Sequence, residues 1–499
     1  MAGELHNSSP SNPAYMAPIW DRLARNNVKT VIGAASWELV EPQEGRFDFA
    51  AVDDQIRQAR ARGLRLVLIW FGAYKNAEST YAPSWVRRDE TRFPRAVRDP
   101  DAKLQGIAAF LRASVALSVF NDRLVEADAR AFAALMRHIR QVDQAQNLIL
   151  VQVENEVGLI GDSRDRSPLA ERAWSQPVPA ALMSYLQQNR DKLRPHLRDA
   201  WGRQGFRTSG TWADVFGTDK VADEVFMAWG FARYVERVAQ AGAAEHRLPM
   251  YANAWLGPQA KSPEPGDYPS GGPVARMMDV WKAAAPTLAF LSPDIYIDEF
   301  AATLADFHRS DNPIFVPEAK PDTGNLFVAL GRYSAIGFSP FGIEDVPEDH
   351  DLFKAYRVLD TLRPQIARAQ QEGRIRGFRT GTPGDLKQTL GRYQIAIAGP
   401  RPTQGLFGAG TGSAAPVNIE GYGLIIQMAE DEFLIVAKAA SFQFTVPDEQ
   451  VEVDWAQEGR FEKGQWIPGR TLNGDERHNL FSPGKMNTVR MRLLRRPQR

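Results

Sequence analysis

The stretch Leu148–Gly158 constrains the fold of this chain more than any other. It reads Leu-Ile-Leu-Val-Gln-Val-Glu-Asn-Glu-Val-Gly, so an apolar run ends in an amide and carboxylates before a glycine. A short apolar run of this kind is typical of a strand that is buried on both faces, as in a parallel sheet. In α/β barrels, polar side chains at the end of such a strand form the site of chemistry. An ordinary acidic turn after a buried strand is the alternative.

Similar apolar runs recur along the first three quarters of the chain, and helical patterns separate them. The candidate strands lie near residues 30, 67, 150, 251, 291, 315 and 336, with helices expected over 18–26, 51–62, 125–142, 274–284 and 352–369. This alternation predicts a parallel sheet covered by helices. A (β/α)8 TIM barrel over residues 1–370 needs one more strand, and residues 1–6 offer only the end of one. We therefore expect a barrel with a clipped first strand, or else an open seven-stranded sheet.

Two regions depart from the alternating pattern. Residues 160–245 form a long excursion that is mostly helical, with helices expected over 179–200 and 223–244. Residues 373–499 contain short alternating runs at 392–398, 423–428, 432–438, 441–445, 451–454 and 489–493, and a glycine-rich connector at 408–413. Alternating runs separated by turns predict a C-terminal antiparallel β-sandwich domain.

The composition excludes several classes of partner and site. Lys and Arg together number 60, as do Asp and Glu, so nothing favours binding of nucleic acid or an anionic membrane surface. There is no Cys, which excludes disulfides and thiolate metal sites, and the seven His are scattered, so we expect no metal or cofactor. The start of the chain lacks a signal peptide, and no apolar stretch is long enough to span a bilayer. The compartment, the export of any longer parent chain and the oligomeric state stay open.

A second strand also ends in a carboxylate, and the two carboxylates together indicate a function. Glu318 follows the apolar run that ends at Pro317, much as Glu156 follows its own strand. Because the carboxyl ends of all barrel strands face one mouth, we expect both side chains in one pocket. Two converging carboxyl groups are what glycoside hydrolysis requires, one as proton donor and the other as nucleophile or base.

Three motifs in the first third of the chain resemble those of glycoside hydrolase family 35, the β-galactosidases. They are Gln152–Gly158, the Trp-Glu-Leu-Val-Glu-Pro-Gln-Glu-Gly-Arg-Phe-Asp-Phe segment at 37–49, and Gly3-Glu4-Leu5-His6. The resemblance implies that Glu156 is the acid/base, Glu318 the nucleophile and Asn155 a clamp for a sugar hydroxyl. The long helical excursion is more similar to family 42 β-galactosidases.

Other candidate substrate-binding residues are weighed against structural roles. Strand alternation places Glu154 on the same side as Glu156, with a structural ion pair as the alternative. The resemblance implies that Tyr296 hydrogen-bonds the nucleophile and that Asn76 lies where the family has a sugar-binding carboxylate. The aromatic residues at strand ends could stack on sugars or pack in the core: Trp70, Trp255 and Phe341.

The expected function is that of a retaining glycoside hydrolase that removes terminal β-D-galactose from oligosaccharides or polysaccharide side chains. A retaining mechanism requires carboxyl groups about 5–5.5 Å apart. Another exo-glycosidase, such as an α-L-arabinopyranosidase or a β-glucosidase, and a non-catalytic carbohydrate-binding barrel are the alternatives.

Overall fold

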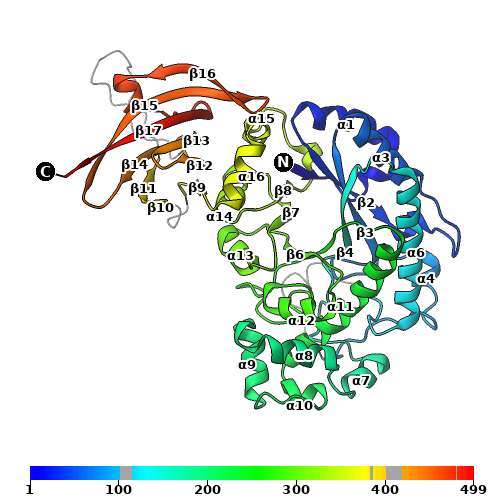
Figure 1. Ribbon diagram of the computed structural model, residues 1–499. Helices are drawn as coiled ribbons and strands as arrows, with labels where there is room; N and C mark the ends of the chain where they lie inside the picture. Colours follow the sequence, from blue (N-terminus) through cyan, green and yellow to red (C-terminus); the bar gives the residue numbers. More distant parts are fainter. Residues whose placement is uncertain (102–114, 382–385, 400–418, 479, 499) are drawn as a thin grey trace.

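The computed structural model describes residues 1–101, 115–381, 386–399, 419–478 and 480–498 (Figure 1). Its first part contains eight strands in barrel order: β1 (Ala2–Glu4), β2 (Thr30–Ser36), β3 (Arg65–Lys75), β4 (Leu148–Asn155), β5 (Met250–Ala254), β6 (Phe290–Pro293), β7 (Phe315–Ala319) and β8 (Gly337–Pro340). Strands β1 to β6 pair in parallel in sequence order, and β7 pairs in parallel with β8. The bridges Ile295–Ala319 and Glu4–Phe341 join the two sheets at both edges. The predicted (β/α)8 barrel is confirmed, and the eighth strand is the short β1.

Helices surround the barrel strands. They are α1 (Pro13–Arg25), α2 (Trp37–Val40), α3 (Ala50–Ala61), α4 (Ser84–Arg87), α6 (Asp122–Val142), α11 (Lys220–Glu245), α12 (Met278–Ala284), α13 (Phe300–Phe307), α14 (Thr323–Arg332), α15 (Asp351–Thr361) and α16 (Arg363–Gln371). Side chains of Asn12, Asn121 and Asp219 cap α1, α6 and α11 by accepting backbone N–H groups. The single helix expected over 352–369 is two helices, because the chain breaks at Leu362 before Pro364.

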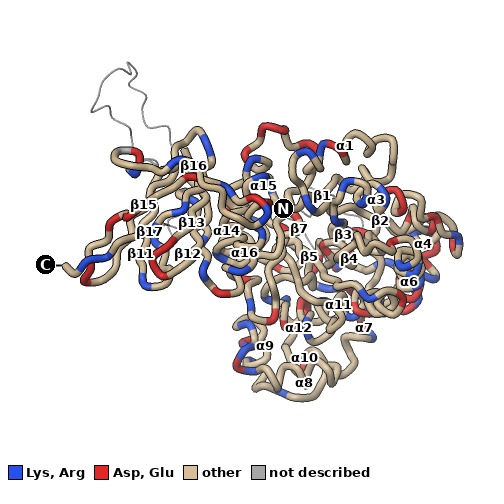
Figure 2. Tube along the Cα trace, turned by 45° about the horizontal axis from the view of Figure 1, so that its top comes forward, with Lys and Arg blue, Asp and Glu red and all other residues tan. Residues whose placement is uncertain are grey.

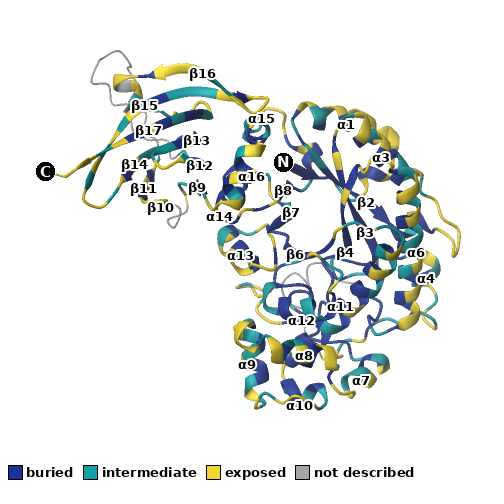
Figure 3. Cartoon of the chain, viewed as in Figure 1, coloured by how far each residue is buried: buried dark blue, intermediate teal, exposed yellow. Residues whose placement is uncertain are grey.

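The strands separate two apolar layers. Ile69 and Phe71 point into the barrel, where the interior cluster also contains Leu150, Tyr251 and Phe290. The alternate side chains of the same strand pack outward against the helices, so the strands are buried on both faces (Figure 3). This two-sided burial explains the continuous apolar runs in the sequence.

The helical excursion after β4 is shorter than expected. It contains α7 (Pro168–Trp174), α8 (Ala180–Gln188), α9 (Pro195–Arg203) and α10 (Trp212–Phe216), which lie together at one end of the barrel domain (Figure 1). The helix expected over 179–200 is interrupted, because Arg194 precedes Pro195 and takes an extended conformation. The helix expected over 223–244 is α11, which packs on α6 and β4 as part of the barrel.

The C-terminal part is an antiparallel β structure of sandwich type, as predicted. Its strands are β9 (Ile375–Arg379), β10 (Lys387–Leu390), β11 (Tyr393–Ala398), β12 (Tyr422–Ala429), β13 (Glu432–Lys438), β14 (Ser441–Thr445), β15 (Glu449–Glu462), β16 (Gln465–Leu472) and β17 (Asn487–Pro497). The sheets β10-β11-β14 and β16-β15-β17-β13-β12-β9 share one apolar core. The connector expected at 408–413 lies outside the described residues.

The β domain packs against the barrel through α14 and α15. Gly331 of α14 meets Gly377 of β9 so closely that a Cβ atom on either would overlap the other backbone. Lys438 and the Tyr422 hydroxyl both bond the carboxylate of Asp351 at the start of α15. Charged side chains of both signs are interspersed over the two parts (Figure 2). Among the described residues, no helix combines the length and apolar character needed to cross a membrane.

Candidate active site

Glu156 directly follows β4 and lies buried at the carboxyl end of the barrel. Its backbone takes a left-handed conformation, with φ of +46°. The Glu156 N–H donates to the Asn253 side-chain oxygen at 3.0 Å, so the end of β5 fixes this turn. A non-glycine residue in this conformation is costly unless its surroundings hold it, and such strain is common at functional sites.

Glu318 lies in β7 with its carboxylate held from the neighbouring strand end. The Tyr296 hydroxyl donates to Glu318 Oε1 at 2.5 Å, and the Ile295 N–H donates to the Glu318 carbonyl oxygen at 2.9 Å. Glu318 and Tyr296 therefore come together as the resemblance implied.

The two carboxyl groups lie in different electrostatic environments. Burial and then the charge of Glu318 raise the pKa of Glu156 to about 8, while the ammonium group of Lys75 acts in the opposite direction. Burial also raises the pKa of Glu318, but the Tyr296 hydrogen bond and Lys75 oppose this increase. At neutral pH, Glu156 therefore carries a proton that it can donate, and Glu318 has two partners that favour its ionised form.

Four further polar residues of the site were missed in the sequence. Glu4 ends β1 and Asp294 follows β6, and both are buried. Asn253 donates from Nδ2 to Asp294 Oδ2 at 2.6 Å, and the Asp294 carboxyl is hydrogen-bonded to that of Glu156. Burial and the neighbouring carboxylates raise the pKa of Glu4 and of Asp294 well above their usual range. Position at a strand end was the signal that could have identified Glu4, Asn253, Asp294 and Lys75.

Lys75 lies at the end of β3 between two asparagine side chains. Its Nζ atom donates to Asn76 Oδ1 at 2.6 Å and to Asn155 Oδ1 at 3.2 Å, and it lies 5.0 Å from the centre of the Phe71 ring. Asn155 is 1% exposed, and its Nδ2 atom has no hydrogen-bond partner. Asn76 and Asn155 are thus brought together in the site.

Glu154 and Trp70 lie on the other side of the strands, which corrects two expectations. Glu154 accepts the Tyr74 N–H at 2.7 Å and is hydrogen-bonded to Asp128 of α6. Trp70 donates from Nε1 to Asp128 Oδ1 at 2.8 Å and packs in the outer layer. Alternation fails because the backbone of Glu154 is left-handed, with φ of +62°, which turns its side chain away from that of Glu156.

The remaining aromatic candidates, Phe341 and Trp255, each follow the end of a barrel strand. Phe341 follows β8, is half-buried and makes an edge-on contact with the His6 ring at 4.9 Å between ring centres. Trp255 follows β5 and is half-buried. Their roles as sugar platforms stay predictions.

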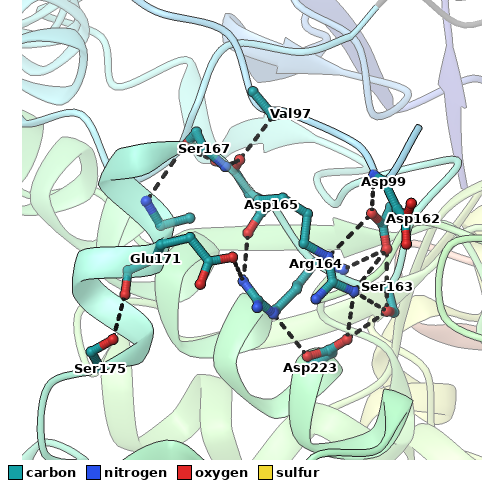
Figure 4. Close-up of polar contacts among 12 residues, drawn as sticks. Val97, Asp99, Asp162, Ser163, Arg164, Asp165, Ser167, Glu171, Ser175 and Asp223 are labelled. Carbon is teal, nitrogen blue, oxygen red and sulfur yellow. Dashed lines mark hydrogen bonds and ion pairs between the residues drawn. The ribbon is translucent and has the colours of Figure 1, made fainter. Parts of the chain in front are cut away.

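A buried polar network fixes the loop that follows Glu156 (Figure 4). Arg164 forms ion pairs with Glu171 at 2.7 Å and with Asp223 of α11 at 3.1 Å. Arg166 forms a second ion pair with Asp223, also at 3.1 Å, and Asp165 accepts the Val97 N–H at 2.9 Å. The chain leaving β4 is therefore attached to the excursion and to α11.

Within the described ranges, no group of three or more His, Asp or Glu side chains is arranged to hold a metal ion. The carboxyl groups at the barrel mouth instead have amide, ammonium and phenol partners. This arrangement suits proton transfer and nucleophilic attack by the side chains themselves.

Comparisons with known proteins identify family models over two parts of the chain. The model of glycoside hydrolase family 42, described as β-galactosidase, matches residues 15–215. A model described as a domain of unknown function (DUF5597) matches residues 352–483. No curated protein sequence matches the chain.

Three solved structures are similar to this chain at low identity. β-Galactosidase from the psychrophilic Marinomonas ef1 is 12% identical, with 74% of this chain and 61% of that chain covered and a TM-score of 0.47. β-Galactosidase from Bacillus circulans sp. alkalophilus is 13% identical, with 74% of this chain and 57% of that chain covered and a TM-score of 0.48. The catalytic domain of β-amylase from Paenibacillus polymyxa is 13% identical, with 72% of this chain and 97% of that chain covered and a TM-score of 0.46. This chain spans less than two thirds of the length of the two β-galactosidases.

The family comparison supports a β-galactosidase family but not family 35 in particular. The matching model is that of family 42, and the resemblance to family 35 is not confirmed; both families belong to one clan of retaining hydrolases. The matched region runs from α1 to α10 and contains Glu156. Over residues 15–215, the chain is thus similar to the family 42 β-galactosidases.

Proposed function

We propose that this chain is a retaining exo-β-galactosidase in which Glu318 is the nucleophile and Glu156 the acid/base. The match of the family 42 model over residues 15–215 supports the substrate class. The similarity of the 37–49 and 152–158 motifs to family 35 supports the same sugar. The substrates are β-galactosides at the non-reducing ends of oligosaccharides or polysaccharide side chains.

The single observation that carries this proposal is the unequal environment of two facing carboxyl groups. Glu156 has a pKa of about 8, so it is protonated at neutral pH, whereas Glu318 accepts a 2.5 Å hydrogen bond from Tyr296. The first step of a retaining mechanism needs a proton donor and a second carboxyl group whose ionised form is stabilised, here by the Tyr296 hydrogen bond.

In the first step, an oxygen of Glu318 forms a bond to the anomeric carbon while the bond from that carbon to the leaving oxygen breaks. Glu156 transfers its proton to the leaving oxygen. The ester that forms removes the negative charge of Glu318, which is one cause of the high pKa of Glu156. The pKa of Glu156 therefore falls, and its carboxylate becomes the base of the second step.

In the second step, the Glu156 carboxylate takes a proton from water. The water oxygen bonds to the anomeric carbon from the face that the leaving group vacated, and the ester bond to Glu318 breaks. Two inversions give galactose with its original β configuration.

The test compares Glu156→Gln and Glu318→Gln with wild type on an aryl β-galactoside. We expect both variants to lose at least about a hundredfold in turnover, which is typical of a missing general acid or nucleophile. Glu224→Gln is the control, because Glu224 is also a buried carboxyl group but belongs to α11, where it pairs with Arg276 and Tyr268. Near-native turnover of either site variant would contradict the assignment.

Labelling with a 2-fluoro-galactoside and a panel of aryl glycosides identify the nucleophile and the sugar. We expect the intact mass to increase by one fluorosugar, with the label on the peptide that contains Glu318. Preference for a β-glucoside or an α-L-arabinopyranoside would replace galactose as the substrate. Absence of any turnover or label would favour a carbohydrate-binding barrel.

A further inference from the structure

Lys75 has a buried ammonium group that donates hydrogen bonds to two amide oxygens. The residue is 9% exposed, and its Nζ atom contacts Asn76 Oδ1 at 2.6 Å and Asn155 Oδ1 at 3.2 Å. Removing an ammonium group from water is expensive unless hydrogen bonds compensate for the loss. A lysine at this position therefore needs a reason beyond packing.

The ammonium group determines which way the asparagine amides face. Lysine has three donors and no acceptor, so only the oxygen of each amide can face Nζ. The NH2 group of Asn155 must then point away from Lys75. The structure agrees, since Asn155 Nδ2 is buried and has no hydrogen-bond partner.

A buried donor without a partner, next to the proposed acid/base, is available to bond a ligand. A buried N–H group without a partner is destabilising, and a substrate that accepts its hydrogen bond removes this cost. Asn155 directly precedes Glu156 in the chain. If Glu156 protonates the leaving oxygen, the amide of the preceding residue can reach the hydroxyl on the sugar carbon beside the reacting one.

We propose that Lys75 is a positioning residue that fixes the amide of Asn155 so that its NH2 group donates to the sugar 2-hydroxyl oxygen. This inference rests on the proposed function and adds a residue that the similarity to known families did not point to. The positive charge has a second effect on the same site, because it opposes the increase that burial causes in the pKa of Glu4, Glu156 and Glu318.

The test measures the preference for a 2-hydroxyl group. It compares kcat/KM for an aryl β-galactoside and for its 2-deoxy analogue with the same leaving group, in wild type, Lys75→Met, Asn155→Ala and the double variant. We expect Lys75→Met to reduce this preference about tenfold or more, because contacts to this hydroxyl strengthen in the transition state. Most of the loss should fall on the galactoside rather than on the deoxy analogue.

The double variant separates positioning from general damage. If Lys75 acts through Asn155, the double variant shows the same preference as Asn155→Ala alone. Lys29→Met is the matched control, since Lys29 pairs with Asp360 at 2.9 Å and precedes β2 at the opposite end of the barrel. This control should keep the wild-type preference.

Asn155→Asp tests the donor without removing Lys75. The carboxylate can still accept from Lys75 but has no N–H group, so the preference should fall as in Lys75→Met even if that variant does not fold. An active wild type whose preference survives Lys75→Met or Asn155→Asp would overturn the inference alone. A wild type that hydrolyses no aryl β-galactoside would instead overturn the proposed function and this inference with it.

Discussion

Replacing Tyr296 with Phe should raise the pKa of the proposed nucleophile and leave that of the acid/base unchanged. The Tyr296 hydroxyl donates to Glu318 Oε1 at 2.5 Å, a short hydrogen bond to a carboxylate. A bond to the ionised form lowers a carboxyl pKa, so its removal raises the pKa of Glu318. The acid limb of the kcat/KM profile should therefore move to higher pH.

The size of this shift follows from the geometry. A hydrogen bond to a charged group contributes about 1.5–3 kcal/mol, and 1.36 kcal/mol corresponds to one pH unit, so the range is about one to two pH units. Tyr296 is 38% exposed, so water can replace part of the lost bond. We therefore expect a shift near the lower end, about one pH unit.

The assay is kcat/KM on an aryl β-galactoside from pH 4 to 9. Tyr251→Phe is the matched control, because the buried Tyr251 hydroxyl has no hydrogen-bond partner in the structure. The basic limb, set by Glu156 near pH 8, serves as an internal reference. An acid limb that stays in place or moves to lower pH in Tyr296→Phe would refute the reasoning.

Three further substitutions test the parts of the fold that support the site. Burial and the neighbouring Asp128 raise the pKa of Glu154 well above its usual range, so wild type loses stability as pH rises above the unfolded value of about 4.3. Glu154→Gln removes this loss. Urea unfolding should therefore show that the free energy of unfolding of the variant increases relative to that of wild type between pH 5 and 8, and a difference between the two that does not change with pH would contradict this. Arg164→Met should cost about 2–4 kcal/mol, because it leaves buried carboxylates with fewer partners, and an unchanged urea midpoint would argue against it. Lys438→Met should lower the free energy of unfolding by about 1–2 kcal/mol through its lost bond to Asp351, which calorimetry would measure.

The sequence predicted the barrel because burial on both faces leaves a visible pattern. Each central strand appears as an apolar run, and the prediction at Leu148–Gly158 agrees with β4. Strand β16 (Gln465–Leu472) was missed because it is mostly exposed and contains Pro468, so neither alternation nor β propensity marks it. Only its pairing with β15, a tertiary feature, makes it a strand.

The sequence predicted the site residues that can be recognised from a single strand end. It missed residues whose partners become known only when the strands close into a barrel. Glu156 and Glu318 follow apolar runs that are visible one by one. Lys75 also lies at a strand end, but its partner Asn155 is known only once β3 lies beside β4. Asp294 likewise depends on Asn253 of the adjacent strand.

Two hydrogen-bonded carboxyl pairs, Asp128–Glu154 and Glu156–Asp294, lie on the two sides of the end of β4. Their hydrogen-bond partners distinguish a structural pair from a pair in the proposed site. Behind the strand, Asp128 accepts from Trp70, Tyr234 and the Ala73 N–H, and it is hydrogen-bonded to Glu154, so this pair is closed. In the barrel, the Glu156–Asp294 pair leaves Asp294 Oδ1 without a hydrogen-bond partner among the described residues, and the same holds for Asn155 Nδ2. Fully satisfied buried networks rigidify a fold, whereas unsatisfied polar atoms need a ligand to compensate them. The residue two positions before the proposed acid/base thus anchors the strand, and the open hydrogen-bonding positions beside Glu156 are those that a sugar can fill.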